Sequence, residues 1–279
     1  GYFTFLGYRD YDQAGKKGEL LGILRNKEAP LFADTPENEE RFFEKGFLKE
    51  KNFLITKTRA LSTIHRLVPM DVLCIKKFDA SGLPVGERQF FGLFTSSVYS
   101  HSVQDIPLLR KRTDHVLTCE GATPDSHKGK VLLHILESFP RDEFFQADIS
   151  FMVNTAQSIM DLKERQRLAL FVRKDPLEHI VSCLIYVPRD RFNSNFREKI
   201  SHLLQQTFQG AVLSFTTEMG GDLTFARVHF LIATSPLFQE EVSVESLETH
   251  LHQLSLTWEE RLKEHMVEMT APEASRLFV

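Results

Sequence analysis

The sequence predicts an α+β protein with two mainly antiparallel sheet regions joined by helices. Short apolar runs separated by turn residues fill the N-terminal part, and similar runs return after residue 164. Between them, apolar residues recur at helical spacing. Since the strand-like runs come in hairpin pairs, antiparallel sheets fit better than parallel βαβ winding. We therefore expect a sheet domain at 1–104, a helical bridge at 105–163 and an α+β domain with a C-terminal helix at 164–279.

The N-terminal part is interpreted as strands separated by polar turns. Aromatic and β-branched residues occur at strand spacing, and Gly15–Gly18 and Asp79–Gly82 supply turn residues between neighbouring runs. Thr35 and Pro36 resemble a helix start, as cap and first helical residue. The strands are expected at 2–9, 20–24, 53–58, 72–78 and 85–94.

The rest of the chain alternates between helices and strand pairs. Three helices are expected in the bridge, starting at Asp105–Pro107, near Asp125–Ser126 and near Asp148, and Pro140 should stop the second. The run 180–187 is apolar almost throughout, as is typical of a strand buried on both faces. The C-terminal elements are expected at 168–172, 180–187, 193–208, 211–217, 224–233 and 244–267, in the order strand, strand, helix, strand, strand, helix.

Composition argues against several classes of function. The net charge of −4 disfavours binding of nucleic acid by bulk charge, and the basic run Arg110–Arg112 is interpreted as a solvated helix face. No window approaches 18 apolar residues, so no membrane span is expected. Cys74, Cys119 and Cys183 are too far apart for a zinc or disulfide framework, which suits a cytoplasmic location. The missing initial Met indicates a piece of a longer polypeptide.

The candidate site is the cluster Ser62, Thr63, His65 and Arg66, just after a predicted strand. Two hydroxyls, an imidazole and a guanidinium could bind an anion or effector, contact another domain or act as a Ser–His pair in a hydrolase. A plain hydrogen-bond cluster at a strand end is the simpler interpretation, because no oxyanion-hole signature accompanies the cluster.

Common catalytic and cofactor motifs are missing from the sequence. It contains no G-x-G, P-loop, G-x-S-x-G or H-E-x-x-H pattern. The eleven histidines are scattered and are interpreted as surface or satisfied core residues rather than metal ligands. Asp142–Glu143 is interpreted as solvated charge at a helix start, not as an acid–base pair. We expect no catalytic, cofactor or metal site in these residues.

Seven separated motifs resemble, in combination and order, the large bacterial NAD-specific glutamate dehydrogenases. No single motif would suffice, but together they extend over nearly the whole chain. They lie at residues 3–9, 62–66, 86–96, 105–110, 126–137, 140–146 and 186–192.

The resemblance implies that the chain belongs to the N-terminal regulatory region of such an enzyme, ahead of its catalytic and nucleotide-binding domains. The front half would be a PAS-associated (PAC-like) sheet domain, and the back half an ACT-like, ferredoxin-like sandwich. NAD would bind elsewhere in the parent enzyme. One departure is the turn Lys174–Glu178, which lacks the Gly found in many amino-acid-binding ACT domains and is followed by a strand instead of a helix. This departure disfavours a small-molecule site at the turn.

Two functions remain open at this point. The first is a non-catalytic regulatory and assembly segment of an NAD-dependent glutamate dehydrogenase. Its partners would be other domains of the same polypeptide and sister subunits of a homo-oligomer, with an acidic amino acid as candidate effector. The alternative is a free-standing amino-acid-sensing protein of PAS/ACT type. The ACT-like sheet is expected to pair through edges or helices with another such unit, unless the helix near 148–163 or the C-terminal helix covers its second face.

Overall fold

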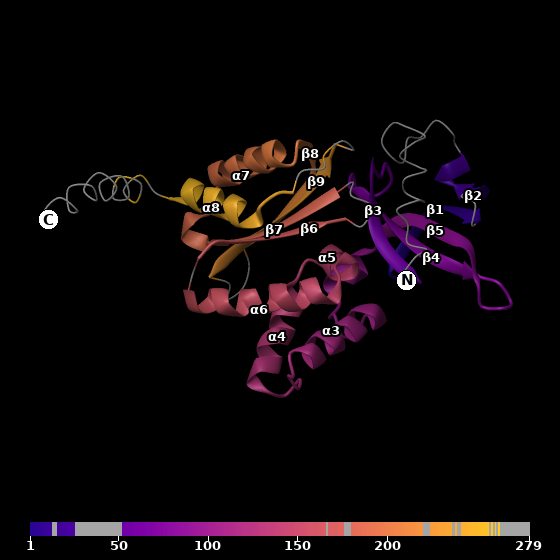
Figure 1. Cartoon of the computed structure of the whole chain (residues 1–279), viewed down its shortest axis with the longest axis horizontal. Helices are drawn as coiled ribbons and strands as arrows, with labels where there is room; N and C mark the ends of the chain where they lie inside the picture. The colour runs from indigo at the N-terminus through magenta and orange to yellow at the C-terminus, as the bar shows by residue number, and fades with distance from the viewer. Residues whose placement is uncertain are drawn as a thin grey trace, which may run out of the picture.

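The computed structural model describes residues 1–12, 16–25, 52–165, 167–175, 180–219, 224–235, 241–256 and the single residues 238, 258, 260 and 262. Two antiparallel sheets lie side by side, and a group of helices packs below them (Figure 1). Among the described residues, no strand runs from one sheet into the other. The predicted α+β class with two antiparallel sheets is therefore confirmed.

The first sheet has the strand order β2-β1-β5-β4-β3. Its β4–β5 hairpin closes as the sequence predicts, because the Asp79 carboxylate accepts hydrogen bonds from the amides of Ser81 and Leu83, at 2.8 and 2.9 Å. Gly82 takes the left-handed backbone conformation that this turn requires, with φ +80°. The strands are β1 (Phe3–Asp12), β2 (Lys17–Gly22), β3 (Phe53–Leu61), β4 (Pro69–Phe78) and β5 (Pro84–Phe94).

Strand β2 ends earlier than predicted. The return strand was expected to reach residue 24, but Ile23–Arg25 forms a 3-10 turn. Gly22 makes this turn possible: its φ is +63°, and a Cβ there would lie 2.1 Å from the carbonyl oxygen of Leu6. The helix start predicted at Thr35 lies outside the described residues.

The helical segment contains the three predicted helices and two that were not predicted. The predicted ones are α3 (Pro107–Cys119), α4 (His127–Ser138) and α6 (Ile149–Arg165). Ser126 caps α4 by accepting a hydrogen bond from the Gly129 amide at 3.0 Å. The short helices α2 (Ser96–Ser100) and α5 (Arg141–Gln146) were missed.

The second sheet has the strand order β6-β7-β9-β8. All of β7 except its last residue is buried, which confirms the prediction for 180–187. Strand β9 separates β7 from β8, so β7, α7 and β8 form a split βαβ unit. The elements are β6 (Ala169–Lys174), β7 (Ile180–Pro188), a 3-10 turn (Arg189–Arg191), α7 (Ser194–Thr207), β8 (Gly210–Glu218), β9 (Phe225–Thr234) and α8 (Val244–Ser255).

The predicted C-terminal helix is interrupted. A continuous helix was expected to residue 267, but α8 ends at Ser255, and Leu256 has extended backbone with φ −64° and ψ 139°. Residues 258, 260 and 262 beyond this break are again helical. Leu256 is only 8% exposed. The helix ends where the Leu256 side chain is buried in the fold. Local hydrophobic periodicity does not predict such tertiary contacts. Residues 263–267 lie outside the described part of the chain.

Helices cover both faces of the second sheet. Helices α7 and α8 pack on one face, where Phe196, Ile200 and Leu251 join the inward-facing residues of β6, β7 and β9 in one hydrophobic cluster. On the opposite face, Leu184 and Tyr186 belong to a cluster with the buried residues of α3 to α6. The second face is thus covered by the helical segment, which was the alternative considered from the sequence.

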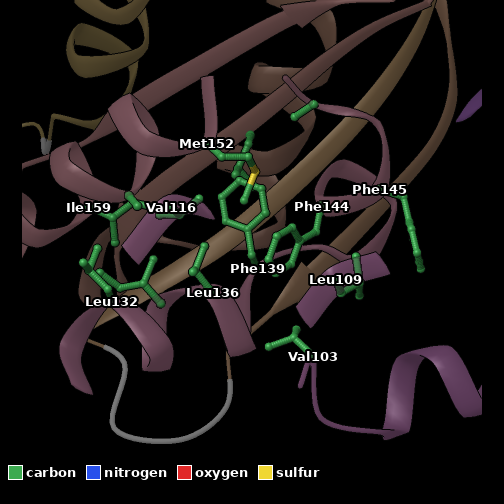
Figure 2. Packing of buried hydrophobic residues seen from close by; sticks show 14 of the residues in the cluster. Val103, Leu109, Val116, Leu132, Leu136, Phe139, Phe144, Phe145, Met152 and Ile159 are labelled. Atoms are coloured by element: carbon green, nitrogen blue, oxygen red, sulfur yellow. The ribbon is translucent and has the colours of Figure 1, made fainter. Parts of the chain in front are cut away.

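The larger cluster is shared between the two sheets. It contains Ile55 and Phe94 from the first sheet as well as residues of the second. Figure 2 shows the helical part of this core, where Phe139 and Phe144 lie beside Met152. The rings of Phe94 and Phe145 stack with centroids 4.4 Å apart, so a residue of β5 packs directly on α5.

Candidate functional site at the α5 junction

Helix α5 lies between the two sheets (Figure 1), and its polar side chains reach three neighbouring elements. Consecutive residues of an α-helix point about 100° apart, so Asp142 and Glu143 face different partners. Phe144 and Phe145 are buried and anchor the helix in the core. We call the polar contacts of α5 and their partners the α5 junction.

Asp142 faces the first sheet, where it shares a buried lysine with Asp71. Lys57 Nζ lies 2.7 Å from Asp71 Oδ1 and 3.1 Å from Asp142 Oδ2. The Tyr99 hydroxyl donates to Asp142 Oδ1 at 2.9 Å, and the Phe94 amide donates to Asp71 Oδ2 at 3.0 Å. These contacts tie β3, β4, β5 and α5 together around one cation.

The electrostatics of this cluster follow from one cation between two carboxylates. Burial works to lower the pKa of Lys57, but Asp142 and Asp71 outweigh it, and that pKa lies above its ordinary value. Burial raises the pKa of Asp71, while the ammonium of Lys57 holds the pKa of Asp142 below its usual value against the effect of burial. Lys57 therefore stays charged, and Asp71 is the carboxyl that more readily takes up a proton.

Glu143 faces the second sheet and binds Arg173 of β6 in a two-pronged ion pair. Arg173 donates to the two carboxylate oxygens of Glu143 at 2.8 and 2.7 Å and to Gln146 Oε1 at 3.0 Å. Burial works to raise the pKa of Glu143, yet the guanidinium outweighs it and holds that pKa well below its usual value. Since Glu143 is 1% exposed, this pair joins α5 to β6 out of contact with water.

Ser182, His229 and Glu143 lie close together but do not form a catalytic triad. His229 Nε2 lies 2.8 Å from Ser182 Oγ and 3.6 Å from Glu143 Oε1. A triad places the acid on the ring nitrogen opposite the nucleophile, whereas here one nitrogen faces both groups. Ser182 is also 2% exposed, so a substrate cannot reach it in this conformation.

Further hydrogen bonds fasten the ends of α5 and join the sheets directly. Arg141 donates to the backbone carbonyls of Val98 and His101 at 3.3 and 3.1 Å, which holds α2 against α5. Arg112 donates to the carbonyl of Ala147, where α5 ends. Thr56 of β3 donates to Asp175, directly after β6.

Two sequence interpretations are corrected by these contacts. Asp142–Glu143 was interpreted as solvated charge, but the Glu143 side chain is 1% exposed and the Asp142 side chain 22%. Arg112 was placed on a solvated face, but it is half-buried and bonded to Ala147. The available signal was the position of the acidic pair between Pro140 and two phenylalanines, which favours a short buried helix.

The predicted cluster at residues 62–66 forms a tight turn after β3. The Ser62 hydroxyl donates to the Ile64 carbonyl at 2.8 Å and accepts from the Ile64 amide at 3.1 Å, so it is engaged within its own turn. Thr63 and His65 are exposed, and His65 has a left-handed backbone with φ 63°. The Arg66 side chain does not bond within this turn. Its guanidinium donates to the Phe94 carbonyl at 2.8 Å.

Arg66 is thereby connected with the α5 junction. Its guanidinium lies 5.1 Å from the ring centroid of Tyr99, which in turn binds Asp142. Of the four predicted site residues, the structure brings only Arg66 to the junction. The other members of the junction were not predicted from the sequence as site residues. They are Lys57, Asp71, Tyr99, Asp142, Glu143, Arg173, Ser182 and His229.

The described part of the chain holds no cluster of three or more His, Cys, Asp or Glu side chains arranged for a metal ion. No helix there has the length and hydropathy needed to cross a bilayer. A surface groove of about 680 Å³ runs between the start of β6 and α8, lined by Arg167, Leu168, Val244, Glu245, Glu248, Thr249, His252 and Gln253.

Family models match two consecutive stretches of the chain. The model described as "Glutamate dehydrogenase, helical motif 1" matches residues 106–165, which contain α3 to α6. The model described as "Glutamate dehydrogenase, ACT2 domain" matches residues 169–259, which contain the second sheet with α7 and α8.

Three curated relatives are NAD-specific glutamate dehydrogenases. Those of Halomonas elongata and Pseudomonas aeruginosa are each 32% identical, over 99% and 96% of this chain but only 18% and 17% of their own length. That of Mycobacterium tuberculosis is 30% identical over 94% of this chain and 16% of its own length. The chain thus spans less than a fifth of these relatives.

One solved structure, a blue-light activated histidine kinase of Erythrobacter litoralis EL346, aligns with 85% of this chain and 96% of its own. Its TM-score is 0.23 at 8% identity, which supports no conclusion.

The fold and the junction define an α+β protein with an ACT-type module packed on a helical motif. The two models and the relatives agree on one family. The chain belongs to the large NAD-specific glutamate dehydrogenases, as its sequence motifs implied.

Proposed function

We propose that this chain is a non-catalytic regulatory and assembly segment of an NAD-dependent glutamate dehydrogenase of the cytoplasm. The parent enzyme would convert L-glutamate, NAD and water to 2-oxoglutarate, ammonium and NADH on domains outside these residues. The observation that carries the proposal is the α5 junction, whose buried charges bind one another across several elements. Such groups fix the packing of modules and are not free to act on a substrate.

The partners proposed are other domains of the same polypeptide and sister subunits of a homo-oligomer. Exposed apolar side chains on the first sheet support such contacts: Phe53 and Ile75, cross-strand neighbours on β3 and β4, are 41% and 39% exposed. The five-stranded antiparallel sheet supports the PAC-like assignment of the front half, which rests on the resemblance.

An activity assay tests the non-catalytic role. The purified 279-residue chain, mixed with glutamate and NAD, should form no NADH above the buffer background. The full-length parent enzyme, assayed at the same molar concentration, is the positive control. NADH formation by the chain itself would overturn the proposal.

The alternative function is a free-standing sensor of an acidic amino acid. Asp175 lies at the turn after β6, where ACT modules often bind such ligands. Its carboxylate accepts a hydrogen bond from Thr56, so this position already carries a negative charge. A second carboxylate, from a bound amino acid, would be repelled there. Calorimetric titration of the chain with glutamate and aspartate tests for such a ligand. The full-length parent sequence separates the two functions, because only the regulatory segment requires catalytic and nucleotide-binding domains in the same polypeptide.

A further inference from the structure

The helical residues that follow α8 expose two large apolar side chains. Trp258 is the only tryptophan of the sequence and is 76% exposed, and Leu262, one helical turn further along, is 45% exposed. Burial of such side chains is favourable, and tryptophan is common at the centre of protein interfaces. The pair is therefore a candidate contact surface.

An ion pair determines which side of this segment faces the rest of the protein. Arg191, in the 3-10 turn after β7, donates to Glu260 Oε1 at 2.7 Å. At about 100° per residue, Trp258 and Leu262 point within about 40° of each other, and Glu260 points about 180° from the middle of that pair. Because Arg191 holds Glu260 against the protein, the two apolar side chains face away from it.

The sequence continues this apolar stripe beyond Leu262. Met266 and Met269 follow Leu262 by four and seven residues, which is the spacing of one face of a helix. Pro272 is a residue that ends helices. The sequence therefore predicts a stripe of about three helical turns that starts at Trp258.

We propose that this stripe pairs two copies of the chain as antiparallel helices, which bury Trp258 and Leu262 of both copies. The proposal deepens the assembly role proposed above and rests on it. Trp258 of each copy packs near Met269 of the other. Because both copies use the same stripe, the contact is two-fold symmetric and closes at a dimer.

Charge complementarity favours a second copy, and the antiparallel orientation, as the occupant of the stripe. Arg261 and Glu268 are seven residues apart, so they flank the stripe on the same side. In the antiparallel pair, Arg261 of each copy lies beside Glu268 of the other, which gives two ion pairs. In a parallel pair in register, Arg261 would lie beside Met266 instead, and these ion pairs would be lost.

Sedimentation velocity combined with tryptophan fluorescence tests this proposal on the 279-residue chain. The chain should form a reversible dimer as its concentration rises. The emission should shift to the blue over the same concentrations, because Trp258 is the only tryptophan and leaves water on pairing. Leu262→Ala should weaken the dimer at least about tenfold, since each copy loses a buried apolar contact.

Charge reversal tests the register of the two helices. Arg261→Glu and Glu268→Arg should each weaken the dimer roughly tenfold, because both ion pairs become repulsive. A chain with both changes should dimerise like wild type, since opposite charges meet again in exchanged positions. Lys263→Glu is the matched control: it makes the same change of charge about 120° from the middle of Trp258 and Leu262, and should leave the dimer unchanged.

Three results overturn the proposal. The first is a chain that stays monomeric at every concentration, and the second is a dimer that forms without a change in the emission of Trp258, since another surface then forms it. The third is a doubly reversed chain that dimerises as weakly as the single variants. Restoration in that chain excludes misfolding as the cause of a loss. None of these results touches the non-catalytic role, which is tested separately by the NADH assay.

Discussion

Glu143 is a carboxylate shielded from water whose charge is balanced by a single guanidinium. Its two oxygens bind Arg173, and His229 lies close to one of them. A buried ion pair contributes little compared with a well-packed apolar substitute, but removal of one partner leaves an uncompensated charge. A small chemical change at Glu143 is therefore expected to have a large effect on stability.

Glu143→Gln should lower the free energy of unfolding by about 3 kcal/mol, because Arg173 then remains buried without its counter-charge. Urea titration followed by circular dichroism measures the change. The matched control is Glu198→Gln, whose side chain is 71% exposed and should change stability by less than about 0.5 kcal/mol. Equal effects of the two substitutions would contradict this account of the junction.

Glu143 should also give the chain a specific sensitivity to acid. Its pKa in the folded state lies below the ordinary value of 4.5, so its contribution to stability is complete above that value and is lost as pH falls through the folded pKa. The unfolding free energies of wild type and Glu143→Gln should therefore converge between about pH 5 and pH 2. Chemical unfolding at each pH measures both curves, and a constant difference down to pH 2 would refute the prediction.

At the scale of elements, α8 has two tasks. Leu247 and Leu251 cover the hydrophobic face of the second sheet, and Glu248 between them binds the Leu170 amide of β6. The same helix thus closes the core and protects an edge. A substitution at Glu248 can separate the two tasks, because this side chain binds the β6 edge while Leu247 and Leu251 make the apolar contacts.

Glu248→Ala should expose the β6 edge without removing the apolar contacts of α8. The expected result is increased self-association relative to wild type, seen as larger species in sedimentation velocity, because the β6 edge then offers an unbonded amide to another strand. Glu245→Ala is the control, since Glu245 lies on the same helix and removes the same charge. Larger species in both variants would show that charge, not the edge, governs association.

Elements with strong local signals were predicted well from the sequence. The β4–β5 hairpin follows from Asp79 and Gly82, and α4 follows from its Ser126 cap and apolar stripe. Helix α5 was missed because six residues are too few to show helical periodicity. The members of the junction were missed because Lys57 and Arg173 lie far from α5 in the sequence, and no local pattern records such long-range partners.

At the scale of the whole molecule, the two sheets pack on a shared core, although none of the described strands runs from one sheet into the other. They share the larger hydrophobic cluster, and Thr56 binds Asp175 directly across the boundary. Helix α5 adds one charged contact to each sheet. One hydrophobic core thus extends across the boundary between the two sheets.

The two sheets should consequently open in one cooperative step. Native-state hydrogen exchange should give the slowest amides of β4 and β7 the same free energy of opening, and Glu143→Gln should lower both values equally. Mass spectrometry of peptic fragments resolves the two strands. Loss of protection in β7 at a denaturant concentration where β4 stays protected would show that the sheets are independent.

Helix α5 is also short enough to move as a rigid body. Six residues rise only about 9 Å, and two large rings fix it in the core. Asp142 and Glu143 project from adjacent positions, so a rotation that pulls one carboxylate from its cation swings the other as well. A displacement of Arg173 at the second sheet would therefore rotate α5 and move Asp142 relative to Lys57 at the first sheet.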